Sequence, residues 1–330
     1  MAASRDTTHA NTVPIVMAVD GSASAPFGAP APDVPASHSS SPRGTERMTR
    51  ASPFRVTLRR LLHHRLFVLG CLLFGIILLV AILAPLIARV DPNKLSMRTK
   101  FRPPGGDFIF GTDNFGRSVW SRVVWGARLS MLIGGAVVLI NAVLGTAIGA
   151  AAGYFRRLDN GLMRINDALM AFPAVLLAIG VTAVLGPSIG DVIIALAIVY
   201  TPRTARIVRS SVIVLREMEY VQAARAAGAG HWRILRYHVL PNAMAPLIVQ
   251  LSFLFAYAVL TEATLSFLGV GAVPPTPTWG NIMAEGRQYM IDAPWIITIP
   301  GAALMITVLG LNLLGDGLRD VLDPRLRIQQ

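Results

Sequence analysis

Lysine is nearly absent from this chain of 330 residues, and cysteine occurs once. The two lysines, Lys94 and Lys100, lie in one short stretch, and neither belongs to the Gly-Lys-Ser/Thr motif that cradles nucleotide phosphates. A single Cys71 excludes an internal disulfide and has no metal-ligand spacing around it. The sequence also offers no nucleophile–base pair and no metal cluster. We therefore expect no enzyme activity and no cofactor or metal bound by this chain.

Charge is scarce as well. Only 15% of the residues are charged, against about 25% in soluble domains. Hydrophobic residues make up 53% of the chain and the mean hydropathy is +0.56, which indicates a membrane protein with lipid as a partner. The net charge of +12 would suit nucleic acid. However, no basic face recurs away from the ends of the apolar runs, so we expect no nucleic-acid partner and interpret these charges as flanks that orient membrane spans.

Long apolar runs dominate the rest of the chain, and a membrane span needs about 20 such residues. We expect an all-α membrane protein with six transmembrane helices at residues 66–87, 130–152, 167–185, 192–207, 246–270 and 295–314. Pro173 predicts a kink in the third span. The fourth is the weakest, because Arg203 and Arg206 must reach the interface. In the second, Gly145, Gly149 and Gly153 share one helix face, which predicts close approach of another backbone.

The ends and the orientation follow from composition. Residues 1–50 are rich in Ser, Ala, Pro and Thr and predict a disordered tail. A start of translation at Met48 instead of Met1 is a hypothesis, and both starts are open. We divide the remainder into a first span with an external loop (51–127), a core of five spans (128–316) and a cytoplasmic tail (317–330). With both termini in the cytoplasm, 21 Lys and Arg lie inside and nine outside, which favours this orientation.

One polar segment between the fourth and fifth spans has an unusual composition. It reads "EYVQAARAAGAGHWRILRYHVLPN", residues 219–242. Its alanines favour a helix with a smooth face, and Gly228 and Gly230 permit a sharp turn. A second helix would follow and end at Pro241. Two interpretations are open: a short helix that lies in a groove on another protein, or an ordinary amphipathic helix at the membrane surface.

The same segment resembles the cytoplasmic signature loop of permeases in ABC importers. The matching residues are Gln222, Ala223, Ala224, Gly228, Leu240 and Pro241. The family pattern opens with Glu, and Gln222 keeps its length and hydrogen-bonding capacity. Four further segments, at 110–131, 153–179, 260–283 and 312–327, resemble the dipeptide, oligopeptide and nickel branch of this family, and within it the second, C-type permease subunit. The resemblance covers about residues 50–327.

The resemblance implies a location in the bacterial inner membrane and a complex of several subunits. Such a chain pairs with a second homologous permease, two ATP-binding subunits hydrolyse ATP-Mg on the cytoplasmic face, and an extracytoplasmic binding protein delivers the solute. The loop then couples the ATPase to the spans. Peptides are the leading substrate class, with nickel chelates, glutathione and glycosides open. The alternatives are an ion-coupled secondary transporter, which predicts paired intramembrane charges and repeats, and a membrane scaffold.

Two acidic residues stand near or inside the predicted spans. Glu262 lies in the fifth span, where an intramembrane carboxylate suggests a function. A role in side-chain packing or helix capping and a role in lining the translocation path are both open. Asp167, near the inner end of the third span, is predicted to pair with Arg164 one helical turn earlier.

Overall fold

The computed structural model describes residues 53–322, and every regular element in this range is helical. The predicted tail, Met48 and residues 323–330 lie outside this range. The α-helices are α1 Pro53–His63, α2 Arg65–Ile82, α3 Ala84–Ile87, α4 Val119–Tyr154, α5 Arg156–Met170, α6 Ala174–Leu185, α7 Ile189–Arg216, α8 Glu219–Ala226, α9 His231–Ile234, α10 Leu240–Phe267, α11 Trp279–Gly286 and α12 Trp295–Leu322. Two short 3-10 helices, η1 Met97–Thr99 and η3 Arg287–Tyr289, and a π-helical turn, η2 Leu235–Val239, complete the list.

Four helical segments in the described range are long and apolar enough to cross a membrane: α2, α4, the continuous run His231–Phe267, and α12. A fifth is present if α5 and α6 count as one broken span. The expected all-α membrane fold is confirmed at this level. The helix α7 has 28 residues but carries Arg203, Arg206 and Arg209, and it is not among these candidates. The count of six spans therefore stays a prediction.

Two predicted spans differ from the helices that form. The third is broken rather than kinked: α5 and α6 meet at 95°, because Pro173 fixes its own backbone and disfavours helix at Phe172. The second begins earlier than predicted, at Val119, where the Ser118 side chain caps the helix by accepting the N–H of Ser121. At 36 residues, or about 54 Å, α4 is longer than a bilayer core is thick. The arginines in its first turns can therefore lie outside the apolar core of the membrane.

The helices α4 and α7 lie against each other through the predicted glycine face. A Cβ added at Gly145 would lie 2.7 Å from Thr204 Cβ, and one at Gly153 would lie 2.8 Å from Val212 Cβ. At Gly149 the neighbour is the backbone of Ala205 itself. The prediction of close backbone approach is therefore confirmed, because no side chain fits at these positions without separating the helices.

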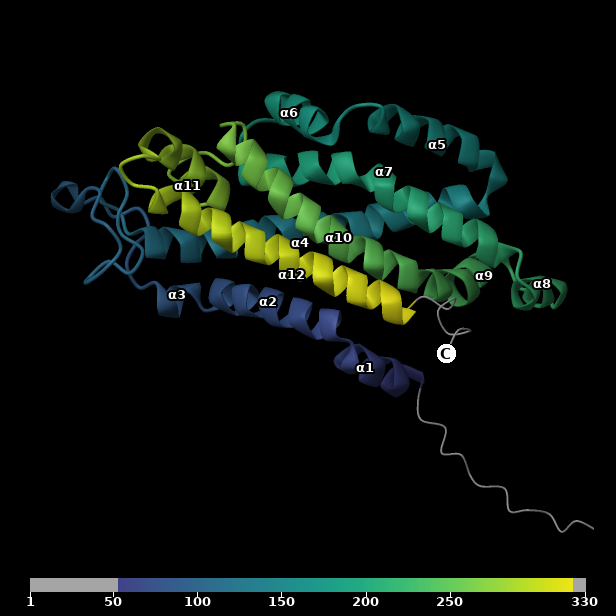
Figure 1. The fold of residues 1–330 in the computed structure, drawn as a ribbon. Helices are drawn as coiled ribbons and strands as arrows, with labels where there is room; N and C mark the ends of the chain where they lie inside the picture. Colours follow the sequence, from purple (N-terminus) through teal and green to yellow (C-terminus); the bar gives the residue numbers. More distant parts are fainter. Residues whose placement is uncertain (1–52, 323–330) are drawn as a thin grey trace, which may run out of the picture. The chain divides into compact units, whose positions relative to one another are not determined.

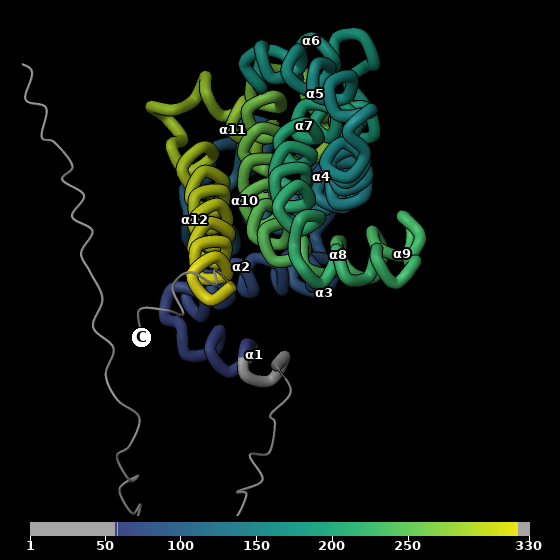
Figure 2. Tube along the Cα trace, turned by 90° about the vertical axis from the view of Figure 1, so that its right-hand side faces the viewer, coloured from purple at the N-terminus to yellow at the C-terminus, as the bar shows by residue number. Residues whose placement is uncertain are grey.

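The long helices run side by side and place different segments at the two ends (Figure 1). The segments α8 and α9 lie at one end, which we call the α8 end, and α11 lies at the other, the α11 end. Figure 2 shows α12, α10, α7 and α4 as neighbours in that order, with α5 and α6 beyond α7. The helix α12 ends at the α8 end, where His64 Nε2 lies 3.3 Å from Asp320 Oδ2.

Candidate functional site

The segment 219–241 folds as a helix, a sharp turn and a second helix. The first helix, α8, ends in a Schellman motif: Ala229 N–H donates to Ala224 O and Gly228 N–H to Arg225 O, both at 3.0 Å. Gly228 has a φ of +81°, the left-handed region that favours glycine, whereas Gly230 has a φ of −69°. The predicted break therefore forms at Gly228, and Gly230 has ordinary extended geometry.

The inner face of this loop is anchored to the long helices. Val221, Ile234 and Val239 are fully buried in one apolar cluster with Val208 and Val212 of α7. The same cluster reaches α4 and α10 and includes the half-buried Ala224 and Leu240. Burial on three long helices fixes the loop to all of them at once.

Hydrogen bonds secure the edges of the loop. Arg216 Nη1, at the end of α7, donates to the carbonyl of Gly153 on α4 at 2.6 Å. The hydroxyl of Tyr154 lies 3.1 Å from His231 Nδ1 on α9. The side chain of Gln222, on α8, donates to Glu217 at the end of α7 at 3.4 Å. The first two bonds tie the end of α7 and the start of α9 to the end of α4.

The outer face of the loop is exposed and built from small residues and aromatics. Gln222, Ala223 and Gly228 are exposed, together with Ala226 and Ala227. Beyond the turn, Trp232 is 72% exposed and Tyr237 66% exposed. Large exposed aromatics beside a smooth alanine face are typical of a protein-contact surface.

The prediction that Pro241 ends the second helix is wrong. The chain continues from α9 through η2 into α10, and Pro241 stands in the first turn of α10. The π-helical turn just before it changes the hydrogen-bond register, which accommodates a residue that has no N–H to donate. Leu240 and Pro241 therefore begin the long helix and do not close the loop.

Glu262 lies on α10 with its side chain fully buried. Its Oε2 accepts from Ser130 Oγ of α4 at 3.2 Å, and its Oε1 accepts from Ser266 Oγ at 2.8 Å. The carboxyl thus joins α4 to α10. The predicted pair of Asp167 with Arg164 does not form: Asp167 accepts instead from Arg206 of α7 at 2.6 Å, which ties α5 to α7.

A buried charge network at the α11 end was missed by the sequence analysis. Arg122 is fully buried, and its Nη1 lies 3.0 Å from Asp113 Oδ2 and 2.8 Å from Glu285 Oε2. Arg117 pairs with the same two carboxylates. Glu285 comes from α11, so the network joins the loop before α4 to α11. The spacing of Asp113, Arg117 and Arg122 was visible in the segment 110–131, but nothing in the sequence pointed to Glu285.

Residues 53–322 hold no group of three His, Cys, Asp or Glu side chains that could bind a metal ion. Long apolar helices with an anchored polar loop at one end define a polytopic membrane protein. Comparison with known proteins narrows this class. Residues 141–328 match the family described as "Binding-protein-dependent transport system inner membrane component". Residues 52–104 match the N-terminal transmembrane domain of oligopeptide transport permease C. The chain belongs to this family of inner-membrane transport components.

Its relatives agree with this assignment. A peptide transport system permease protein of Brucella abortus biovar 1 is 56% identical over 278 residues, 84% of this chain and 94% of the relative. The dipeptide transport system permease protein of Alkalihalophilus pseudofirmus is 42% identical over 288 residues, 87% of this chain and 95% of the relative. The di/tripeptide transport system permease protein of Pseudomonas aeruginosa is 41% identical over 283 residues, 84% of this chain and 93% of the relative.

A solved structure shows the same fold. A chain of the MetNI methionine ABC transporter in an inward-facing conformation aligns with a TM-score of 0.50 and 22% identity, over 60% of this chain and 95% of that chain. The resemblance to C-type permease subunits of peptide ABC importers is confirmed by these comparisons.

Proposed function

We propose that this chain is the C-type permease subunit of an ATP-driven importer of peptides in a bacterial cytoplasmic membrane. Relatives named as peptide and dipeptide permeases support this substrate class. The proposed complex contains a second homologous permease, two ATPase subunits that bind ATP-Mg, and an extracytoplasmic binding protein. This chain binds no cofactor and hydrolyses no ATP of its own in this proposal.

The proposed membrane topology has six spans, with α7 as the fourth. Its 28 residues reach about 42 Å, enough to cross a bilayer core of about 30 Å. Its arginines have partners within reach: Arg209 donates to both carboxylate oxygens of Asp159 on α5. In this arrangement both termini and the α8 end face the cytoplasm, and the α11 end faces outward.

The proposal rests on a single observation: the loop has one buried face and one exposed face. Its inner face is buried against α4, α7 and α10, and its outer face offers exposed small residues. In the proposed mechanism α8 lies in a groove on an ATPase subunit. Closure of the ATPase pair moves α8, and the anchored helices change from inward- to outward-facing, because the two states bind the ATPase differently.

We also propose a structural role for Glu262. Both of its carboxyl oxygens accept hydrogen bonds from serines, one on α4 and one a turn further along α10. A group with no exposed surface offers no contact to a passing solute in this conformation. Its role is then to hold α4 and α10 together.

Uptake of a radiolabelled dipeptide tests the function. Cells lacking this chain should lose uptake and regain it with the wild-type gene, and depletion of ATP should abolish it while collapse of the proton gradient at constant ATP should not. Uptake that follows the proton gradient and not ATP would contradict the proposal. The topology is tested separately: in a Cys71→Ser background, a cysteine replacing Gln222 should react with a membrane-impermeant maleimide only from the cytoplasmic side.

A further inference from the structure

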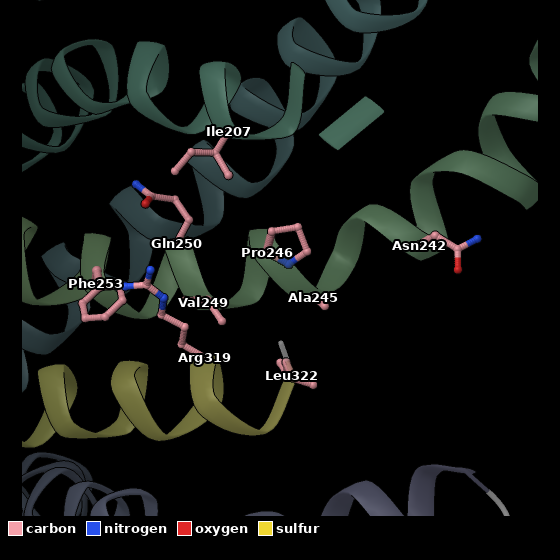
Figure 3. A pocket seen from close by; sticks show the side chains of 9 residues that line it. All are labelled: Ile207, Asn242, Ala245, Pro246, Val249, Gln250, Phe253, Arg319 and Leu322. Atoms are coloured by element: carbon pink, nitrogen blue, oxygen red, sulfur yellow. The ribbon is translucent and has the colours of Figure 1, made fainter. Parts of the chain in front are cut away.

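Two cavities toward the α8 end differ in the charge of their walls. The first lies between α7, α10 and α12, and Arg319 is the one charged side chain that lines it (Figure 3). The second, of about 770 Å³, lies where α4 meets α5, beside the end of α7 and the loop. We call the second cavity the basic pocket, because four of its five charged side chains are arginines: Arg156, Arg157, Arg216, Arg225 and Glu217.

The protein does not neutralise the arginines of the basic pocket. Glu217 is shared between two of them: its Oε1 lies 3.0 Å from Arg216 Nε and 3.8 Å from Arg156 Nη2. Within residues 53–322, Arg157 and Arg225 make no hydrogen bond and no ion pair. Both are exposed, so water solvates them when the pocket is empty. Like charges gathered around one concave site attract an anion that can reach several of them at once.

The first turn of α5 adds a partial positive charge to the same pocket. The helix begins at Arg156, and Phe155 at its N-cap provides no side-chain acceptor. The N–H groups of this turn therefore remain available, and the helix dipole places about half an elementary charge there. Such helix ends bind phosphate groups. A phosphate in the pocket would meet this turn together with the guanidinium groups around it.

An apolar stripe leads away from the pocket along α5. Leu158 lines the pocket and is 49% exposed. Ile165, seven positions later and therefore on the same face of the helix, is 63% exposed. Phe155 is exposed beside them, and its ring lies edge-on to that of Tyr154. Arginines next to an exposed apolar stripe suit a ligand with an anionic head and hydrocarbon chains.

We propose that the basic pocket binds the phosphate of an anionic phospholipid, whose acyl chains lie along Leu158 and Ile165. Basic pockets between helices on the cytoplasmic side of a membrane bind such head groups. The proposal rests on the topology proposed above, in which the α8 end faces the cytoplasm and the pocket lies at the inner leaflet. Through Arg157 and Arg225, one bound lipid links α5 to α8.

Native mass spectrometry of the complete complex of both permeases and both ATPases tests the site without transport. The complex, in a nonionic detergent, is titrated with phosphatidylglycerol and separately with the zwitterionic phosphatidylcholine. We expect the wild type to bind phosphatidylglycerol more tightly. The variant Arg157→Gln/Arg225→Gln should raise the Kd for phosphatidylglycerol about thirtyfold, the factor that two arginines near an anionic head group supply. Arg157→Lys/Arg225→Lys keeps both charges and should restore most of the affinity.

The matched control is Arg164→Gln/Arg233→Gln. It removes two exposed arginines, one from α5 and one from α9, and neither of them lines the basic pocket. Both double variants lower the net charge equally, so a difference between them reports position and not total charge. The control should bind phosphatidylglycerol as the wild type does. Equal Kd values for the two double variants, or equal affinity of the wild type for the two lipids, would overturn the proposal.

Two other occupants of the pocket give different results in the same experiment. Displacement of phosphatidylglycerol by an equimolar amount of inorganic phosphate would assign the pocket to soluble phosphate and overturn the proposal. Loss of the ATPase from Arg157→Gln/Arg225→Gln and not from the control, with equal Kd values for the lipid, would assign the pocket to an acidic side chain of the ATPase and overturn it as well. If the lipid site fails while cells carrying this variant import the dipeptide at wild-type rates, the import function stands.

Discussion

The coupling role of the loop can be tested by placing isoleucine at Gly228 in one variant and at Gly230 in another. Both glycines face open space, since an added Cβ would meet nothing within 4 Å at either. They differ in backbone: φ is +81° at Gly228 and −69° at Gly230. Isoleucine at position 228 should therefore destabilise the native turn by about 1–2 kcal/mol, whereas isoleucine at position 230 fits its extended backbone.

That cost sets the size of the effect. A penalty of about 1–2 kcal/mol lowers the population of the native loop by about 5–30-fold relative to alternatives. The inner face of the loop keeps its anchors, so membrane insertion should be unchanged. We expect Gly228→Ile to uncouple ATP hydrolysis from transport, with several-fold less peptide taken up per ATP hydrolysed.

The assay compares dipeptide uptake and ATPase activity of the two variants in proteoliposomes with the binding protein present. Gly230→Ile should resemble the wild type in both measurements. If Gly228→Ile couples ATP to uptake as well as Gly230→Ile does, the left-handed turn is not needed and the reasoning is refuted.

Three further predictions concern the body of the protein. Asp113→Asn removes a negative charge beside two buried arginines and should lower the free energy of unfolding by about 3–5 kcal/mol, which lowers the melting temperature of the purified protein by about 5–20 °C. The control Asp107→Asn, at an exposed position, should leave the melting temperature unchanged. Equal melting temperatures of the two variants would contradict a stabilising network. Gly149→Val should push α4 from the backbone of α7 and reduce the folded yield, whereas Gly75→Val, which has open space, should not; equal yields would show that the close approach is dispensable. Glu262→Gln should largely preserve the melting temperature and uptake. Glu262→Leu leaves two serines unpaired and should lower the free energy of unfolding by about 1–3 kcal/mol, and the melting temperature with it. Loss of uptake in a stable Glu262→Gln variant would favour a lining role.

The sequence predicted those features that depend on composition and local spacing. The apolar runs predicted the helices because about 20 apolar residues rarely have another fate. The fourfold glycine spacing predicted the close approach of another backbone to α4, and Gly228 and Gly230 predicted the sharp turn after the alanine helix. Each of these signals lies within one segment of the chain.

The failures involve partners far apart in the sequence or competition between local rules. Asp167 pairs with Arg206 and not with its helical neighbour Arg164, because α7 lies beside α5. The sequence around Arg122 does not predict Glu285 as its partner, because Glu285 is more than 160 positions away in the chain. At Pro241 the rule that proline ends a helix gave way to a π-helical turn, which removed the hydrogen bond that proline cannot make.

The central claim is that the outer face of α8 holds an ATPase subunit, and a mild-detergent pull-down of this chain from its own cells, with mass spectrometry, tests it most directly. Beside the wild type, Ala223→Trp adds bulk to the exposed face of α8, and Gly161→Trp adds the same bulk on α5, where an added Cβ meets nothing within 4 Å. The account predicts that a P-loop ATPase and a second multi-span permease co-purify with the wild type and with Gly161→Trp, and that Ala223→Trp loses the ATPase alone. Recovery of the wild type without any ATPase, under conditions that keep other membrane complexes intact, or undiminished ATPase with Ala223→Trp, would contradict it.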